Sequence, residues 1–314
     1  LPTRVLDVGT PKSGDSVRLI VTAGACGYWV ALSHCWGEKE NHPLKTTRKN
    51  ISEHLTRIDM SSLPKTFQDA VVTTRALGFR YLWIDSLCIV QDDEEEWRNE
   101  SHKMATIYEH AVLTLAASAA KDSKQGLFVE RPYGKIKYPS TQLPFIKRDP
   151  QTGENNTLGE YSISLDWRQE PFMEHMDPMF SPIYRRGWCT QEFILSRRII
   201  HFLDEGMMWV CKERAVDETG HFVLAAKRHS DPDWATEWHK IITDHSVRDF
   251  TFESDRLVSL DGLAREVAKA ENNSCKLEEY FYGTWLSDVP ESILWASYRA
   301  HDRETACPSW SWAS

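Results

Sequence analysis

The spacing of apolar residues in the first 120 positions alternates between the patterns of strands and of helices. Residues 18–22 and 28–33 have strand-like composition and flank a glycine-containing turn, which predicts a hairpin. A helix is predicted from Leu63-Pro64-Lys65 to Gly78, because proline favours a first turn and glycine ends a helix. Residues 81–84 form a short apolar run, so this region predicts strand, helix and parallel strand.

The pattern continues with one long predicted helix and another buried strand. Residues 92–110 begin with acidic side chains, which the helix dipole favours, and residues 112–117 are almost wholly apolar. On a helical wheel Glu100 falls on the same side as the apolar residues, so we expect its carboxyl group to face the core. The later chain predicts a hairpin at 199–202 and 207–210, and helices at 234–245 and 255–270.

These elements predict an α/β core with additions. Residues 1–205 are assigned to the α/β domain, with an insertion of irregular or hairpin structure at about 130–180. Residues 206–314 are expected to form a mainly helical C-terminal extension packed on that domain. The missing initiator methionine and the end directly after an aromatic run suggest part of a longer polypeptide.

Composition narrows the classes of partner. The chain has 314 residues, a formal charge of -9 and no run of lysine and arginine, so we expect no binding to nucleic acid. Seven scattered cysteines do not resemble a disulfide framework, and no signal peptide or apolar run of membrane-spanning length occurs. We therefore expect a cytoplasmic protein without a membrane partner. Thirteen tryptophans suggest that some indole rings line a pocket or an interface.

Polar residues follow two of the predicted strands. Ser33, His34, Trp36 and Gly37 come directly after one strand, and Asp85 ends the next, at the edge where α/β sheets bind ligands. Asp85 either hydrogen-bonds a ribose or caps the following turn. The sequence contains neither a metal-ligand spacing nor a glycine-rich phosphate loop, so we expect no metal and no bound cofactor.

Several segments together resemble the fungal heterokaryon-incompatibility (HET) domain. The segments are Ala31-Leu32-Ser33-His34-Cys35-Trp36-Gly37, Leu63-Pro64-Lys65-Thr66-Phe67, Tyr81-Leu82-Trp83-Ile84-Asp85-Ser86-Leu87-Cys88-Ile89, Met104-Ala105-Thr106-Ile107-Tyr108 and Arg186-Gly187-Trp188-Cys189-Thr190-Gln191-Glu192. The resemblance implies self/non-self recognition that ends in cell death. HET domains are distantly similar to TIR domains, which implies a TIR-like, flavodoxin-type, mainly parallel sheet flanked by helices.

Some TIR domains cleave NAD, and their Trp-Cys-x-x-Glu element is similar to residues 188–192 here. The resemblance implies that Glu192 is the catalytic carboxylate, that Trp188 stacks on a base and that NAD is a substrate. Because nicotinamide leaves as a neutral molecule, a carboxylate that stabilises an oxocarbenium-like centre is sufficient. The competing interpretation is an ion pair between Glu192 and Arg185, Arg186 or Arg197.

Glu100 is the alternative acid, and its competing interpretation is a structural role with the Tyr108 hydroxyl or a backbone amide as partner. Three hypotheses for function follow: an NAD glycohydrolase that acts as a homo-oligomer on activation, a non-catalytic oligomerising signalling module, and a HET fold used for other small-molecule chemistry at His34 and Cys35. The sequence leaves open whether the chain is an enzyme.

Overall fold

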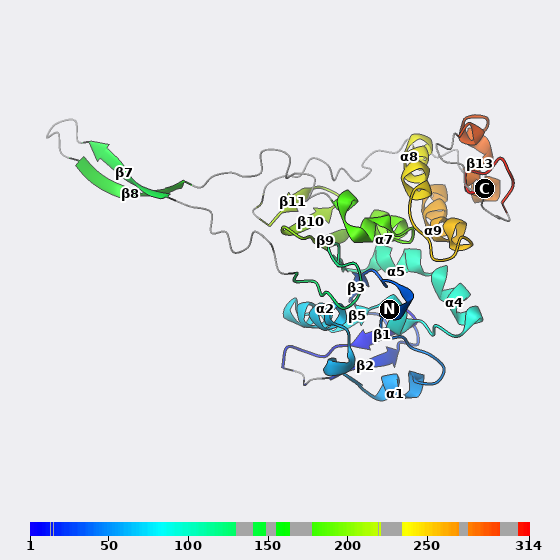
Figure 1. The fold of residues 1–314 in the computed structure, drawn as a ribbon, viewed down its shortest axis with the longest axis horizontal. Coiled ribbons are helices and arrows are strands. Elements are labelled where there is room, and N and C mark those ends of the chain that lie inside the picture. The colour runs from blue at the N-terminus through cyan, green and yellow to red at the C-terminus, as the bar shows by residue number, and fades with distance from the viewer. Residues whose placement is uncertain are drawn as a thin grey trace.

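A computed structural model describes residues 1–12, 14, 16–129, 141–148, 155–163, 178–218, 220, 234–269, 276–295 and 307–314 (Figure 1). The main feature is one sheet of nine strands in the order β11-β10-β9-β6-β3-β5-β1-β2-β4. Its strands are β1 (Arg4–Asp7), β2 (Ser16–Val21), β3 (Trp29–Ser33), β4 (Ile58–Asp59), β5 (Tyr81–Trp83), β6 (Leu113–Ala116), β9 (Arg198–Phe202), β10 (Met207–Cys211) and β11 (Ala215–Asp217).

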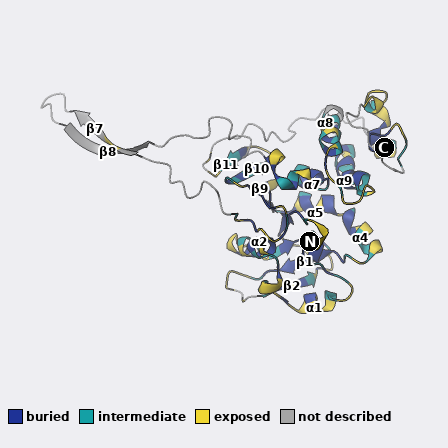
Figure 2. Cartoon of the chain, viewed as in Figure 1, coloured by how far each residue is buried: buried dark blue, intermediate teal, exposed yellow. Residues whose placement is uncertain are grey.

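The sheet is mixed. The four central strands β5, β3, β6 and β9 are parallel, whereas the pairings toward both edges are antiparallel. The expectation of a mainly parallel sheet is therefore wrong, because short hairpins add β1 and β2 on one side and β10 and β11 on the other. Every residue of β3 and β6 is buried, as expected for parallel strands covered on both faces. In Figure 2 the middle of the sheet is correspondingly drawn mostly in dark blue.

The helices that cover the sheet follow the chain order. They are α1 (Ile51–Thr56), α2 (Lys65–Ala76), α3 (Asp85–Cys88), α4 (Glu94–Ser101), α5 (Met104–His110) and α7 (Cys189–Leu195). Crossovers between parallel strands are almost always right-handed, which puts α2 on one face of the sheet and α5 and α7, which contact each other, on the other. Residues of α2, α5 and the central strands together form the main hydrophobic core.

The predicted limits of α2 are confirmed, and the structure shows their cause. Pro64 precedes the first turn, and Gly78 adopts a φ of 80° after the last. The Gly78 amide donates to the Arg75 carbonyl and the Phe79 amide to the Thr74 carbonyl, each at 3.0 Å. This Schellman arrangement satisfies carbonyl groups at the helix end.

Two local predictions are wrong. The strands around 18–22 and 28–33 do not pair, because β2 hydrogen-bonds to β1 and β4 while β3 lies between β5 and β6. The helix expected over 92–110 is two helices, α4 and α5, separated by His102 and Lys103. The break lets α5 turn so that Tyr108 packs edge-to-face on Trp83 of β5.

The C-terminal part adds helices and a small hairpin. Helices α8 (Trp234–Ser246) and α9 (Asp255–Lys269) and the strands β12 (Tyr280–Phe281) and β13 (Thr284–Trp285) contribute to a second hydrophobic core. This core includes Ala105 of α5 and Leu195 of α7, so it packs directly on the helices that cover the sheet. The boundary near residue 205 stays a prediction, while β10 and β11 continue the sheet beyond it.

Within the predicted insertion at 130–180, the structure describes a hairpin of β7 (Thr141–Arg148) and β8 (Asn155–Ile163), which form a sheet of their own. The remainder of that insertion, apart from the residues after 177, lies outside the described residues. No helix in the described parts of the chain has the length and apolar character to cross a membrane.

Candidate functional site

The carboxyl ends of β3 and β6 meet at the point where the chain changes direction in the sheet. From β3 the chain crosses to β5 on one side, and from β6 it crosses to β9 on the other. Ser33, the last residue of β3, pairs with Ala116, the last residue of β6. Such switch points form crevices that bind ligands in open α/β sheets.

The side chain of Glu192 reaches this point from α7, on the face of the sheet that α5 and α7 cover. The Ser33 hydroxyl donates a hydrogen bond to Oε2 of Glu192, and the Cys189 thiol lies 3.7 Å from the same oxygen. Cys189 and Glu192 are three residues apart on the helix, so both face Ser33. Ser33 is 1% exposed and Glu192 is 2% exposed, which makes this a closed polar cluster inside the protein.

The surroundings of Glu192 favour a protonated carboxyl group. Burial raises the pKa of Glu192, while the Arg186 guanidinium and the Ser33 hydroxyl act against that shift and the charge of Asp85 reinforces it. The same guanidinium donates a hydrogen bond to the carbonyl oxygen of His34. Arg186 therefore holds the segment after β3 and places positive charge near the carboxyl group.

The interpretation of Glu192 as an ion-pair partner finds no direct contact among the described residues. Arg185 pairs with Asp249 at 3.3 Å, and Arg197 approaches Glu109 at 3.9 Å. Arg186 acts on Glu192 through its charge, and its own hydrogen bond goes to the backbone.

Trp36, His34 and Asp85 form an adjoining group. The Trp36 indole donates to Oδ2 of Asp85 at 2.9 Å, and Nδ1 of His34 lies 3.8 Å from Oδ1. Asp85, the first residue of α3, also accepts a hydrogen bond from the amide of Ser86 at 2.7 Å, a local contact in the turn that follows β5. Burial lowers the pKa of His34 to about 4, which keeps its ring neutral at neutral pH.

Gly37 ends this segment in a conformation that requires glycine. Its φ is 77°, and an added Cβ would lie 2.7 Å from Cβ of Asp122. The close approach fixes the loop after β3 against the loop after β6.

The cysteines of the region are not poised as nucleophiles. Burial raises the pKa of the Cys35 thiol, raises that of Cys88 to about 12, and raises that of Cys189 well above its ordinary value. A neutral His34 beside a protonated Cys35 lacks the thiolate that nucleophilic chemistry needs.

Trp188 and Glu100 lie outside this cluster. The Trp188 ring packs edge-to-face on Trp97, with centroids 6.2 Å apart, and its indole donates to Asp255 at 3.2 Å. Its described contacts therefore lead to α4 and α9, although its position four residues before Glu192 suggested a shared face.

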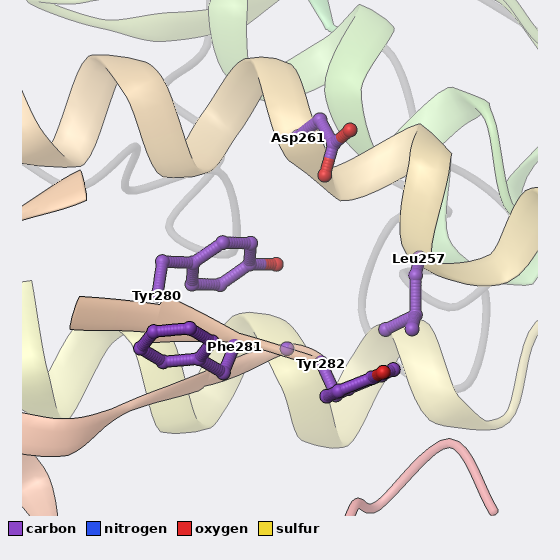
Figure 3. A pocket seen from close by; sticks show the side chains of 6 residues that line it. Leu257, Asp261, Tyr280, Phe281 and Tyr282 are labelled. Atoms are coloured by element: carbon purple, nitrogen blue, oxygen red, sulfur yellow. The ribbon is translucent and has the colours of Figure 1, made fainter. Parts of the chain in front are cut away.

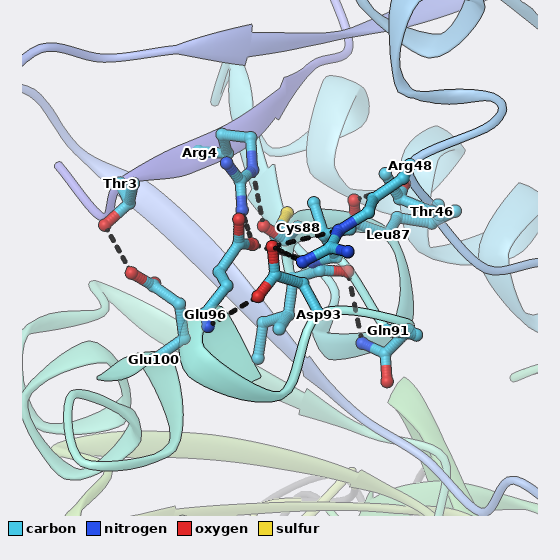
Figure 4. A network of polar contacts seen from close by, with 12 residues as sticks. Thr3, Arg4, Thr46, Arg48, Leu87, Cys88, Gln91, Asp93, Glu96 and Glu100 are labelled. Atoms are coloured by element: carbon cyan, nitrogen blue, oxygen red, sulfur yellow. Dashed lines mark hydrogen bonds and ion pairs between the residues drawn. The ribbon is translucent and has the colours of Figure 1, made fainter. Parts of the chain in front are cut away.

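Glu100 has structural partners. Its Oε1 accepts a hydrogen bond from the Thr3 hydroxyl at 2.8 Å (Figure 4). The same oxygen accepts a second hydrogen bond from the Lys103 ammonium group, also at 2.8 Å. The expectation of a structural partner is met, but the partners are these two and not Tyr108, whose hydroxyl donates to the Leu32 carbonyl at 3.1 Å. In the same network Arg4 pairs with Glu96, which ties β1 to α4.

The model of the family described as "Heterokaryon incompatibility protein (HET)" matches residues 29–192, more than half of the 314 residues. This chain belongs to the HET family. No curated protein and no solved structure gives a match.

The match to the HET model spans the candidate site from end to end. It begins at the first residue of β3 and ends at Glu192, so Ser33 and Glu192, which hydrogen-bond to each other, lie near its two limits. Family membership associates the chain with heterokaryon incompatibility.

The sequence analysis did not assign Arg186 or Cys189 to the candidate site around Glu192. Their place in the segment that contains Trp188 and Glu192 was the available signal, since residues 189 and 192 share a helical face. The contact between Arg186 and the His34 carbonyl joins segments 152 positions apart and had no local signal. Within the described residues, no group of three or more His, Cys, Asp or Glu side chains could hold a metal ion.

Proposed function

We propose that this HET domain is a cell-death effector that cleaves NAD at the bond between nicotinamide and ribose. The observation that carries the proposal is the Glu192 carboxyl group, buried against Ser33 at the switch point of the parallel strands. A carboxylate of this kind can stabilise the positive charge that develops on ribose as nicotinamide leaves.

The order of the central strands supports a TIR-like assignment. Numbered along the chain, the four parallel strands β3, β5, β6 and β9 have the spatial order 2-1-3-4, which is the beginning of the flavodoxin-type order. In that arrangement ligands bind at the β3/β6 edge, where Ser33, Trp36 and Asp85 cluster. The antiparallel edges are additions to this core.

The chemistry assigns roles to the chain's own groups. In the opened site Glu192 loses the burial that raises its pKa, so it faces the ribose in the carboxylate form, and the Ser33 hydroxyl orients it by a hydrogen bond. In this proposal Asp85, which accepts a hydrogen bond from the Trp36 indole, also accepts hydrogen bonds from ribose hydroxyls. After nicotinamide leaves, attack of water on the anomeric carbon of the ribose gives hydrolysis, and attack of an adenine nitrogen gives cyclisation.

The closed state of the cluster implies an activation step. With Glu192 only 2% exposed, a nucleotide reaches it only after the segment after β3 and α7 separate. We propose that homo-oligomerisation drives this opening, so that cleavage occurs in the assembled protein.

The same closure favours a second candidate, a non-catalytic signalling module. In that case Ser33 and Cys189 satisfy Glu192 as part of the core, and oligomerisation itself transmits the signal.

An assay of nicotinamide release separates the two candidates. Purified protein at increasing concentration is incubated with NAD, nicotinamide is followed by chromatography, and oligomeric state is measured by sedimentation. Release that depends on assembly and is lost in Glu192→Gln but kept in Glu100→Gln supports the enzyme. Assembly without release, by protein with an unchanged circular dichroism spectrum, supports the signalling module.

A further inference from the structure

A pocket of about 340 Å³ lies between α9 and the β12–β13 hairpin (Figure 3). It is lined by Leu257 and Asp261 from the helix and by Tyr280, Phe281, Tyr282 and Gly283 from the hairpin. Its volume is at the small end of the range for ligand sites, roughly 300–1,000 Å³. None of its lining residues belongs to the Ser33–Glu192 cluster.

The hairpin holds an aromatic side chain over this pocket in an unusual backbone conformation. Tyr282 and Gly283 have φ values of 49° and 86°, as in a two-residue type I′ turn. Glycine, asparagine and aspartate are the usual residues there, because a bulky side chain disfavours positive φ. Strained positions of this kind are concentrated at ligand-binding sites.

The turn cannot relax easily. An added Cβ on Gly283 would lie 2.3 Å from Nε1 of Trp312, and the Tyr282 ring packs edge-to-face on Trp310 with centroids 5.8 Å apart. The aromatic wall of the pocket is thereby fixed in position.

Two polar groups of the pocket have no partner within the described structure. The Tyr280 hydroxyl is shielded from solvent and makes no hydrogen bond. In Figure 3 it points into the space between Asp261, Leu257 and Tyr282. Trp238 and Trp285 pack against the Tyr280 ring at centroid distances of 5.6 and 4.8 Å, so the hydroxyl has little freedom to reach water.

Asp261 is the second group, and it is half-buried rather than fully shielded from solvent. The charges of Arg265 and His102 act on it, but neither side chain makes an ion pair with it in the described part of the chain. Burial raises the pKa of this carboxyl group, as expected for an acid without a close counterion. The buried Tyr280 hydroxyl is costly without a hydrogen-bond partner, and the charge of Asp261 acts on the same hydroxyl. A ligand that bonds to both groups would remove that cost.

We propose that this pocket binds an organic ammonium group that carries N–H donors. Asp261 pairs with the cation, the Tyr280 oxygen accepts a second N–H, and the rings of Phe281 and Tyr282 contact the alkyl part and face the charge. The net charge of -9 favours the approach of a cation. The shared chemistry is that of a free polyamine and of a lysine side chain.

Calorimetry on the full chain tests the proposal with probes that differ in one property. Spermidine represents a free polyamine, and N-acetyl-lysine methylamide represents a protein side chain. Tetramethylammonium keeps the charge but has no N–H, and 1-pentanol has no charge. We expect saturable binding of at least one amine probe and weaker binding of both comparison compounds, and the tighter amine identifies the source.

Two pocket variants and one matched control complete the test. Asp261→Asn should weaken amine binding about tenfold or more, and Tyr280→Phe by about threefold to tenfold. Glu266→Gln removes the same charge from α9, at a residue that pairs with Lys269, and should leave the affinity unchanged. Thermal unfolding checks that each variant is folded.

Three results would overturn the proposal. The first is the absence of saturable amine binding to the folded wild-type chain. The second is an equal loss of affinity in Glu266→Gln and Asp261→Asn, which indicates a general charge effect. The third is equal affinity for tetramethylammonium and the amines, which removes the role of the two hydrogen-bond acceptors.

Discussion

Replacing Ser33 by alanine removes the only hydroxyl group that donates to the side-chain carboxyl group of Glu192 within the described structure. Because Ser33 and Glu192 are 1% and 2% exposed, solvent does not replace that donor. The Cys189 thiol at 3.7 Å is a weak donor and compensates little. Ser33→Ala should therefore leave a buried carboxyl group short of one strong hydrogen bond.

The cost depends on the charge of Glu192, and so on pH. A hydrogen bond to a charged group contributes about 1.5–3 kcal/mol, and one between neutral groups about 0.5–1.5 kcal/mol. Burial raises the pKa of Glu192 in the folded protein, and the Ser33 hydrogen bond lowers it. The contribution of Glu192 to stability is thus fully present below its ordinary pKa and is lost as pH rises through the raised value.

Ser33→Ala raises this pKa further and enlarges the loss at high pH. We expect the variant to be less stable than wild type by about 0.5–1.5 kcal/mol where Glu192 is protonated and by about 1.5–3 kcal/mol where it is ionised, so the deficit should be larger at pH 8 than at pH 5. Urea unfolding followed by fluorescence of the 13 tryptophans measures both values. When the free energies of unfolding of wild type and variant are compared at the same pH, the contributions from the titration of other groups cancel.

Two further variants test whether the pH dependence comes from the charge of Glu192. In a Glu192→Gln background, Ser33→Ala should cost the same at both pH values. Thr114→Val removes the buried hydrogen bond between the neutral hydroxyl groups of Thr114 and Ser196, whose oxygens lie 2.7 Å apart. The stability loss in this variant should also show no pH dependence. A deficit for Ser33→Ala that is independent of pH with Glu192 present, or that stays pH-dependent with glutamine there, would refute the argument.

Three other changes test the packing and charge of the fold. Gly262→Ala should destabilise the protein by about 1–3 kcal/mol, because the new Cβ would lie 2.3 Å from Cβ of Ala105. The same replacement usually stabilises a helix, so a variant that is more stable than wild type in urea unfolding would contradict this prediction. Gly187→Ala should destabilise by a similar amount, since its Cβ would lie 1.8 Å from the Phe250 ring, and Phe250→Leu should recover part of the loss. His245 has a pKa lowered to about 3 by burial, so its contribution is present above the ordinary value of 6.5 and is lost as pH falls. His245→Gln should therefore reduce the loss of stability between pH 7 and pH 5 by about 2 kcal/mol, and an unchanged slope would show that the ring is accessible.

The elements that could be predicted are those whose cause is local. Proline and glycine set the ends of α2, and continuous apolar runs identify β3, β5 and β6. The parallel pairing of β3 with β5 follows from the intervening helix and the crossover rule, and the structure confirms it.

The elements that could not be predicted depend on distant partners. β1 is a four-residue strand with charged residues at both ends, and its pairing with β2 and β5 supplies the support that its own sequence does not indicate. The separation of α4 from α5 reflects packing of Tyr108 on Trp83, which overrides helix propensity.

By itself, the sequence determined the α/β character, the order of β2, β3, α2, β5 and β6, and the family, because repeated spacing and long motifs are properties of adjacent residues. Only the tertiary structure decided that Ser33 meets Glu192, that Trp188 faces Trp97 and Asp255, and that Glu100 is paired with Thr3 and Lys103. These contacts join residues brought together by sheet order and helix crossing, and buried polar groups then pair with whatever donor lies within reach.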